Sequence, residues 1–365
     1  MIQSLEIKNF KSIRDQKIEL RNLNVLIGQN GAGKSNLISL FTFFERLYQK
    51  QLADYIFSSG GINNFVFGGA RGQKSIGAKI NFVQNGLGYS NYYEFELLSD
   101  GERYVFKKDT VGYSNSARNK SNFWDDGHLR NTESSLQHTD SNIGGYVRNY
   151  FTSFRVYHFH DTSQNSPIKQ LQDIIDIYFA KDGSTIAPYL DWLKNIYPIN
   201  YRAIVESVKL IYPIFHDFYL EESLYAKGKI SLCWMEKGGE NIFKVSQMSD
   251  GTLRFICLAA LLNMPKEIAF PQTIIIDEPE LGLHPKAIEI LAALIKKASV
   301  DRQIIIATQS AALVDNFTPE DIIVADRLAT GETVFNRKTT SELSVWLDDY
   351  SLGELWLSNI IGGRP

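Results

Sequence analysis

A glycine-rich octapeptide ends in a lysine followed by a hydroxyl side chain. Residues 28–35 read GQNGAGKS, which matches the spacing G-x-x-x-x-G-K-[ST]. An apolar run precedes this phosphate loop, and an amphipathic helical pattern follows Ser35. Loops of this type surround a phosphate chain with backbone N–H groups, while the lysine adds positive charge and the hydroxyl binds Mg²⁺. The residues expected to contact the nucleotide are Gly28, Asn30, Gly31, Gly33, Lys34, Ser35 and Asn36.

Two carboxylates follow an apolar stretch late in the chain. Residues 273–278 read TIIIDE, which is typical of a buried strand that ends in acidic side chains. The carboxyl end of a central strand faces the crevice where α/β sheets bind ligands. We expect Asp277 to hold Mg²⁺ and Glu278 to orient a water molecule near the last phosphate. Taken alone, the pair is also compatible with a charged strand end that faces solvent.

A third motif precedes the acidic pair. Residues 249–252 read SDGT and open an apolar helical stretch. A serine and free N–H groups at the start of a helix can bind an anion. This feature supports two readings, a phosphate contact through Ser249 and Gly251 or an ordinary helix cap.

The first half of the chain predicts strands and a long loop. Alternating apolar residues at 79–108, with turn residues at Asn85-Gly86 and Asp100-Gly101, predict an antiparallel sheet. Residues 112–142 are rich in Ser, Asn, Asp and Gly, and they predict a long exposed loop.

The second half predicts helices and then a parallel sheet. Residues 168–179 and 189–225 have helical patterns, and residues 230–245 predict a hairpin with its turn at Gly238-Gly239. From residue 252 onward, helices alternate with short apolar strands. This alternation is typical of a mostly parallel sheet covered by helices.

Composition excludes several classes of protein. The chain has 365 residues, a formal net charge of −3 and 44% hydrophobic residues. These values exclude a fully disordered chain and a histone-like basic protein. Its two cysteines lie in apolar stretches and suggest a reducing compartment. No apolar run is long enough to cross a membrane, and the N-terminus lacks a secretion signal, so we expect a soluble, cytoplasmic protein.

The order of motifs resembles the ABC-type ATPase heads of the SMC, RecF and OLD-like class, and in particular compact stand-alone bacterial ATPases. The resemblance rests on LEIKNFKSI near the start, SDGT at 249–252, ELGLHP at 280–285 and ATQS at 307–310. It implies an α/β P-loop NTPase with a mostly parallel core sheet, an antiparallel β subdomain and a helical lobe. The implied segments are 1–165 with the phosphate loop, 166–245 with the helical lobe and hairpin, and 246–365 with the remaining motifs.

The resemblance also implies site residues and partners. It places Ser249 and Gly251 in a signature that covers the nucleotide of a second subunit, and it places Lys11 near the nucleotide. Gln309 stands at the switch position, and His160 follows the strand expected at 154–159; both are candidate catalytic residues beside Glu278. The implied ligands are ATP and Mg²⁺, and the implied assembly is a homodimer that forms when ATP binds.

The cellular role stays open at this level. The resemblance implies an ATPase that regulates a partner protein or acts on DNA. The alternative is a nucleotide-dependent scaffold, or a sensor subunit of an anti-phage defence system, with little turnover. A transporter cassette is disfavoured because the signature is not LSGGQ. The slightly acidic charge favours a protein effector over DNA.

Overall fold

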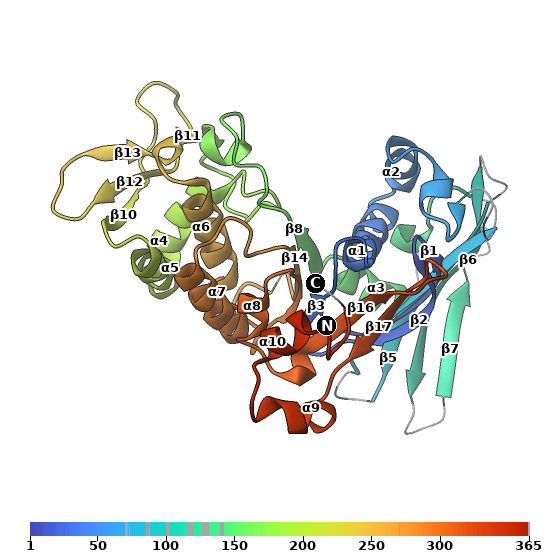
Figure 1. Ribbon diagram of the computed structural model, residues 1–365. Helices are drawn as coiled ribbons and strands as arrows, with labels where there is room; N and C mark the ends of the chain where they lie inside the picture. The colour runs from blue at the N-terminus through green and yellow to red at the C-terminus, as the bar shows by residue number, and fades with distance from the viewer. Residues whose placement is uncertain are drawn as a thin grey trace.

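The computed structural model describes residues 1–69, 72, 74–84, 86, 88–99, 103–115, 120–125, 131–138, 142–269 and 271–363. Two lobes flank a central sheet, with α1 in one lobe and α4, α5 and α6 in the other (Figure 1). Both expected sheets are present, one mostly parallel and one antiparallel. The α/β class predicted from the sequence is therefore confirmed.

The parallel sheet forms the centre of the molecule. Its strand order is β17 (Thr333–Arg337), β16 (Ile322–Arg327), β3 (Leu23–Ile27), β15 (Gln303–Ala307), β14 (Thr273–Asp277) and β8 (Phe154–Tyr157). Every neighbouring pair is parallel except β16 and β17. Parallel strands that are covered on both faces read as continuous apolar runs, which explains the sequences of β3, β14 and β15.

Helices cover both faces of this sheet. Along β3, Val25 and Ile27 join a core formed with α6 (Asp250–Leu262) and α7 (Pro285–Ala298). Leu26 points to the opposite face and joins a core formed with α1 (Lys34–Tyr48) and the antiparallel sheet. The shorter helices near the C-terminus are α8 (Ala311–Val314), α9 (Thr340–Leu347) and α10 (Leu352–Leu357).

The antiparallel sheet extends further than the sequence suggested. Its order is β2 (Ile13–Glu19), β1 (Ile2–Phe10), β4 (Ser75–Phe82), β5 (Ser90–Ser99), β6 (Tyr104–Asn115) and β7 (Lys120–Asp125). The long loop expected at 112–142 is wrong for its first part, because β6 runs to Asn115 and pairs with β7. Ladder hydrogen bonds stabilise these polar strands despite their weak periodicity. Asn85 and the expected turn at Asp100-Gly101 lie outside the described residues.

Helices pack against one face of the antiparallel sheet. α3 (Asn142–Phe151) contacts β5 and β6, and α2 (Leu52–Ser58) contacts α1. Aromatic rings fill the space between α1 and the sheet; Phe43 stacks on Phe95 with 5.4 Å between ring centroids. This packing fixes α1, and with it the loop that precedes it.

The helical lobe contains α4 (Ile186–Ile196) and α5 (Pro198–Ile211) but fewer helices than predicted. The helix expected at 168–179 is wrong: β9 (Gln172–Asp173) pairs with β11 (Lys229–Ile230). The Gln172 side chain is buried and accepts a hydrogen bond from the Ala187 amide, which holds the segment extended. Ile175, counted in the helical pattern, is 81% exposed.

The second predicted helical stretch also ends early. After Pro213 the chain forms β10 (Phe215–Tyr219), because proline removes a helical hydrogen bond. β10 pairs with β12 (Cys233–Glu236), which pairs with β13 (Ile242–Lys244), so the hairpin expected around Gly238-Gly239 is confirmed. In the described part of the chain, no helix is both long and apolar enough to span a bilayer.

Candidate functional site

The candidate site lies where the parallel strands end. β3 leads into Gly28, β14 ends at Asp277, and β15 leads into Thr308. Because these strands are parallel neighbours, their carboxyl ends share one edge of the sheet. Motifs far apart in the sequence therefore meet at this edge.

The phosphate loop presents unpaired N–H groups at the start of α1. No side chain caps this helix, whose N-cap residue Gly33 has a left-handed φ of 111°. Among the described residues, the amides of Gly31, Gly33, Lys34 and Ser35 have no hydrogen-bond acceptor. Exposed amides at a helix N-terminus attract anions through their partial positive charge. The loop can therefore bind phosphate groups.

A chain of buried hydrogen bonds supports the loop from behind. Asn36 Nδ2 donates to Ser12 Oγ at 2.7 Å, and the Ser12 and Thr333 hydroxyl oxygens lie 2.7 Å apart. Thr333 Oγ1 donates to the Ala32 carbonyl at 2.7 Å. A Cβ atom on Gly33 would lie 2.3 Å from Thr333 Oγ1, so only glycine allows this close approach.

Sequence reasoning missed Thr333 and Arg327 as supports of the loop. Arg327 Nη1 donates to the Gly31 carbonyl at 3.1 Å. Both residues come from β16 and β17, about 300 residues downstream of the loop, and no motif marks them. Only the strand order of the sheet brings them to the phosphate loop.

Lys34 lies within the loop and points toward the acidic residues. Its side chain is almost fully buried, and Nζ donates to the carbonyls of Gly28 at 2.5 Å and Gln29 at 3.3 Å. Burial lowers the pKa of the Lys34 amine, and the Glu278 and Asp277 carboxylates oppose that shift. A lysine held in this way can supply positive charge to a phosphate chain.

Asp277 and Ser35 form an oxygen-rich pair. The Ser35 hydroxyl and the Asp277 carboxylate lie near each other. Burial, followed by the Glu278 charge, raises the pKa of Asp277, while His160 and Lys34 oppose the rise. A hydroxyl beside a carboxylate is a donor set that suits Mg²⁺, so these residues fit the metal that the sequence implied.

Glu278 is held in a strained conformation at the strand end. Its φ of 45° lies in the left-handed region, a backbone conformation that costs energy for any residue other than glycine. Its N–H donates to the Ala307 carbonyl at 2.8 Å, and Gln309 Nε2 donates to its Oε1. The structure therefore brings together Gln309 and Glu278, two of the residues predicted for the site. Such strain is concentrated at functional sites in proteins.

Lys11 lies beside the phosphate loop in a separate cavity of about 530 Å³, which Ser12, Asn36 and Arg327 also line. Its Nζ sits 5.3 Å from the centre of the Phe65 ring, and burial lowers the pKa of the amine. Asn30 is exposed in the loop, and among the described residues it makes no side-chain hydrogen bond. Both residues are near the loop, and their roles stay predictions.

Ser249 is an exposed helix cap. Its Oγ accepts a hydrogen bond from the Thr252 amide at 3.2 Å. Among the described residues, no hydrogen bond joins Ser249 to the phosphate loop of the same chain. Gly251 packs on the turn after the acidic pair, where an added Cβ would lie 2.2 Å from the Gly282 carbonyl oxygen.

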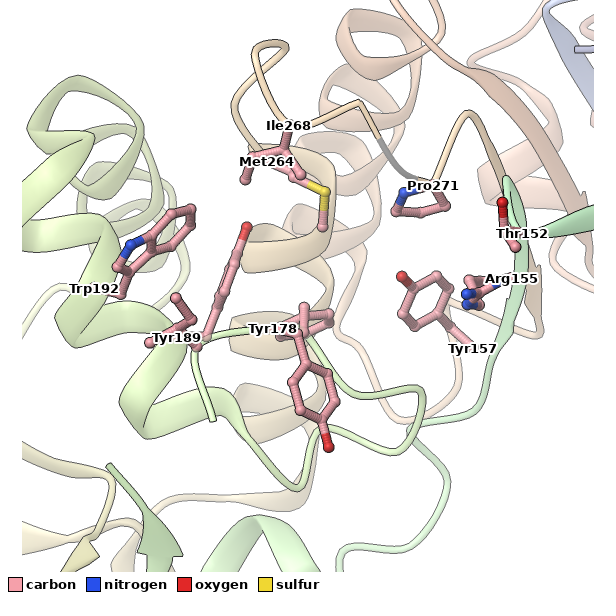
Figure 2. A pocket seen from close by; sticks show the side chains of 11 residues that line it. Thr152, Arg155, Tyr157, Tyr178, Tyr189, Trp192, Met264, Ile268 and Pro271 are labelled. Atoms are coloured by element: carbon pink, nitrogen blue, oxygen red, sulfur yellow. The ribbon is translucent and has the colours of Figure 1, made fainter. Parts of the chain in front are cut away.

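A different cavity, of about 460 Å³, lies at the amino end of β8 and does not include the predicted site. Figure 2 shows its walls, formed by Arg155 and Tyr157 on one side and Tyr189 and Trp192 on the other. None of the residues predicted to bind nucleotide or Mg²⁺ lines this cavity. The predicted nucleotide and Mg²⁺ residues therefore lie outside this cavity.

Comparisons with known proteins agree with this geometry. A curated relative from Helicobacter pylori (strain ATCC 700392 / 26695), named ATP/GTP phosphatase, is 56% identical over 39 residues; the match covers 10% of each chain. An SmcHead solved with the C-winged helix domain of ScpA aligns at TM-score 0.58 and 18% identity, covering 93% of this chain and 99% of that one. A Smc head domain solved with the C-terminal domain of ScpA derived from Pyrococcus furiosus aligns at TM-score 0.59 and 16% identity, covering 95% and 98%.

The structural likeness establishes the fold of an SMC head, as the sequence implied. A family model described as "AAA domain, putative AbiEii toxin, Type IV TA system" matches residues 23–315, which is more than half of the chain. The match begins at β3, immediately before the phosphate loop, and ends shortly after Gln309. The chain therefore belongs to this AAA-domain family of P-loop ATPases.

Proposed function

We propose that this chain hydrolyses ATP with Mg²⁺ at the sheet edge where β3, β14 and β15 end. We also propose that ATP joins two copies head to head. The convergence of Lys34, Ser35, Asp277 and Glu278 at one sheet edge carries the first proposal. These four side chains supply, in one place, a charge for phosphate, two oxygen ligands for Mg²⁺ and a carboxylate for water.

Each residue has a separate task in this mechanism. The free loop amides and Lys34 hold the phosphate chain and stabilise the charge that develops during transfer. Ser35 and Asp277 would hold Mg²⁺, which would neutralise phosphate charge there. Glu278 accepts a hydrogen bond from the attacking water and takes up its proton, while the Gln309 amide orients the carboxylate.

The proposed dimer rests on the position of the SDGT helix. Ser249 is exposed at the N-terminus of α6, which lies in the lobe opposite α1 (Figure 1). The amides at this helix start can approach a phosphate carried by another copy. ATP bound between two copies then stabilises the dimer, and hydrolysis releases it.

Sedimentation with and without ATP tests this arrangement in the slowly hydrolysing Glu278→Gln background. The parent should dimerise on ATP, and the added Ser249→Arg substitution should prevent dimerisation without weakening ATP binding. Ser344→Arg, on the exposed face of α9, is the matched control and should dimerise normally. Dimerisation of the Ser249→Arg protein, or a parent that stays monomeric with bound ATP, would refute the head-to-head mechanism.

We also infer that a partner protein binds this chain only in its ATP-bound state. Both Smc heads described above were solved with a domain of ScpA bound, which supports a protein partner for this fold. The test is affinity purification of the Glu278→Gln protein with ATP, compared with Lys34→Ala. A protein enriched only in the ATP-competent sample supports this role. DNA recovered in its place, with binding that falls steeply with salt, would favour the DNA reading.

A further inference from the structure

Glu280 lies inside the ELGLHP segment, and the proposed mechanism gives it no role. Its Oε1 accepts two hydrogen bonds, from Thr308 Oγ1 at 2.5 Å and from the Gln309 amide at 3.0 Å. Its Oε2 is buried and, among the described residues, has no hydrogen-bond partner. The side chain therefore reaches from the loop after β14 to the turn after β15.

These contacts hold the residue that contacts Glu278. Thr308 Oγ1, which donates to Glu280, also accepts a hydrogen bond from the Ser310 amide at 3.0 Å. The backbone of Gln309 is bound by Glu280, and its side-chain Nε2 is bound by Glu278. The carboxylates of Glu278 and Glu280, which lie in one loop, thus bind the side chain and the backbone of Gln309.

Stability alone does not explain this arrangement. A buried carboxyl oxygen without a partner costs free energy, because it loses its hydrogen bonds to water. Burial also raises the pKa of the Glu280 carboxyl, and the Thr308 hydroxyl opposes that rise. An apolar side chain of the same size would avoid both costs, but it would leave the Thr308 hydroxyl and the Gln309 amide without this acceptor. The carboxyl group therefore carries a desolvation cost while it fixes the Thr308–Gln309 turn.

We propose that Glu280 is a positioning residue for hydrolysis, which fixes the Gln309 backbone so that the Gln309 amide holds the Glu278 carboxylate toward the water. This inference rests on the proposed function for its catalytic consequence. Its geometric part, the control of Gln309 by Glu280, can be measured without any turnover.

The first experiment observes the Gln309 side-chain amide by NMR in protein labelled with [¹⁵N]glutamine. Its signal is assigned by its absence in Gln309→Ala. In the parent, the hydrogen bond to Glu278 should shift the signal downfield and slow its exchange with water. Glu280→Gln keeps one acceptor oxygen and should keep this signature. Glu280→Leu removes both oxygens and should move the signal to the range of exposed glutamines.

An unchanged Gln309 signal in folded Glu280→Leu protein would overturn the proposal. Circular dichroism establishes that each variant is folded. If Glu280→Leu does not fold, Glu280→Met provides the same test with a side chain that adapts more easily to the site. Glu289→Leu, an exposed glutamate on α7, controls for the loss of one negative charge.

The second experiment measures steady-state ATP hydrolysis. Glu280→Leu should lower kcat about 10²-fold, because small displacements of catalytic groups have effects of that size. KM should change by less than about threefold, since the phosphate loop is untouched. Gln309→Ala should show a similar loss, and the double variant should lose no more than either single variant. Glu280→Gln should retain most activity.

The outcomes separate the two proposals. Additive losses in the double variant, or a rise in KM without a fall in kcat, would assign Glu280 a merely structural role. A parent protein that hydrolyses no ATP would refute the proposed function. In that case the Gln309 amide signal still decides whether Glu280 positions Gln309.

Discussion

Replacing Thr333 with valine removes one hydroxyl group from behind the phosphate loop and keeps the shape of the side chain. Thr333 and Ala32 are fully buried, and the Thr333 hydroxyl joins the Ala32 carbonyl to Ser12. Valine leaves the Ala32 carbonyl without its side-chain donor and Ser12 without its acceptor. No cavity forms, so the effect measures hydrogen bonding rather than packing.

The contacts set the expected magnitude. A buried acceptor that loses its partner costs about 1–3 kcal/mol, and the loss of an ordinary hydrogen bond costs about 0.5–1.5 kcal/mol. The free energy of unfolding should therefore fall by about 2–4 kcal/mol. In ligand-free Thr333→Val, the phosphate loop loses this support and becomes less ordered. ATP binding must then order the loop, so ATP affinity should fall about 5–30-fold, the equivalent of about 1–2 kcal/mol.

Urea unfolding and isothermal titration calorimetry measure the two effects. Thr333→Ser is the matched control, because it keeps the hydroxyl group and removes only a methyl group. We expect the serine variant to bind ATP as the parent does, despite some loss of stability. Wild-type ATP affinity in Thr333→Val, or a greater loss of affinity in Thr333→Ser, would refute the idea that this hydrogen-bond chain supports the loop.

Three further predictions concern the site itself. Lys34→Ala should abolish ATP binding in calorimetry, because it removes the buried charge beside the loop amides; unchanged affinity would place the nucleotide elsewhere. Glu278→Gln should keep ATP binding and lose about 10²–10⁴-fold in kcat in a phosphate-release assay, and near-parental turnover would exclude Glu278 as the base. Burial raises the pKa of Asp277 in the folded chain, so its charged form destabilises the fold, and this cost of Asp277 to the ligand-free protein should shrink as the pH falls from neutrality through the raised pKa. Accordingly, Asp277→Asn should raise the melting temperature at pH 7.5 while it removes Mg²⁺-dependent hydrolysis, and a lower melting temperature would contradict the sign of this argument.

Sequence alone was sufficient where local chemistry determines structure. The phosphate loop, the acidic pair and the SDGT segment each combine residue types with a spacing that has a specific physical use. The continuous apolar runs before Gly28 and Asp277 predicted buried parallel strands, and β3 and β14 confirm them. The class of protein followed from these local features.

Periodicity was misleading where tertiary contacts outweigh local preference. Residues 168–179 have apolar side chains at helical spacing, yet the buried Gln172 side chain and pairing with β11 hold residues 172–173 extended and so interrupt a helix. Residues 112–115 and 120–125 look like a polar loop, but they lie in β6 and β7, which pair with each other, and β6 also pairs with β5. The partner strand of Gln172–Asp173 lies more than 50 residues further along the chain, so a local pattern cannot reveal it.

The sequence by itself determined which residues are predicted to carry the chemistry, because a phosphate loop and an acidic strand end are local patterns. Only the tertiary structure decided how these residues are held. Thr333 meets Gly33 because β17 and β16 follow β3 in the sheet. Glu280 reaches Gln309 because β14 and β15 are parallel neighbours whose ends share one edge. Supports of this kind depend on strand order, which no spacing along the chain encodes.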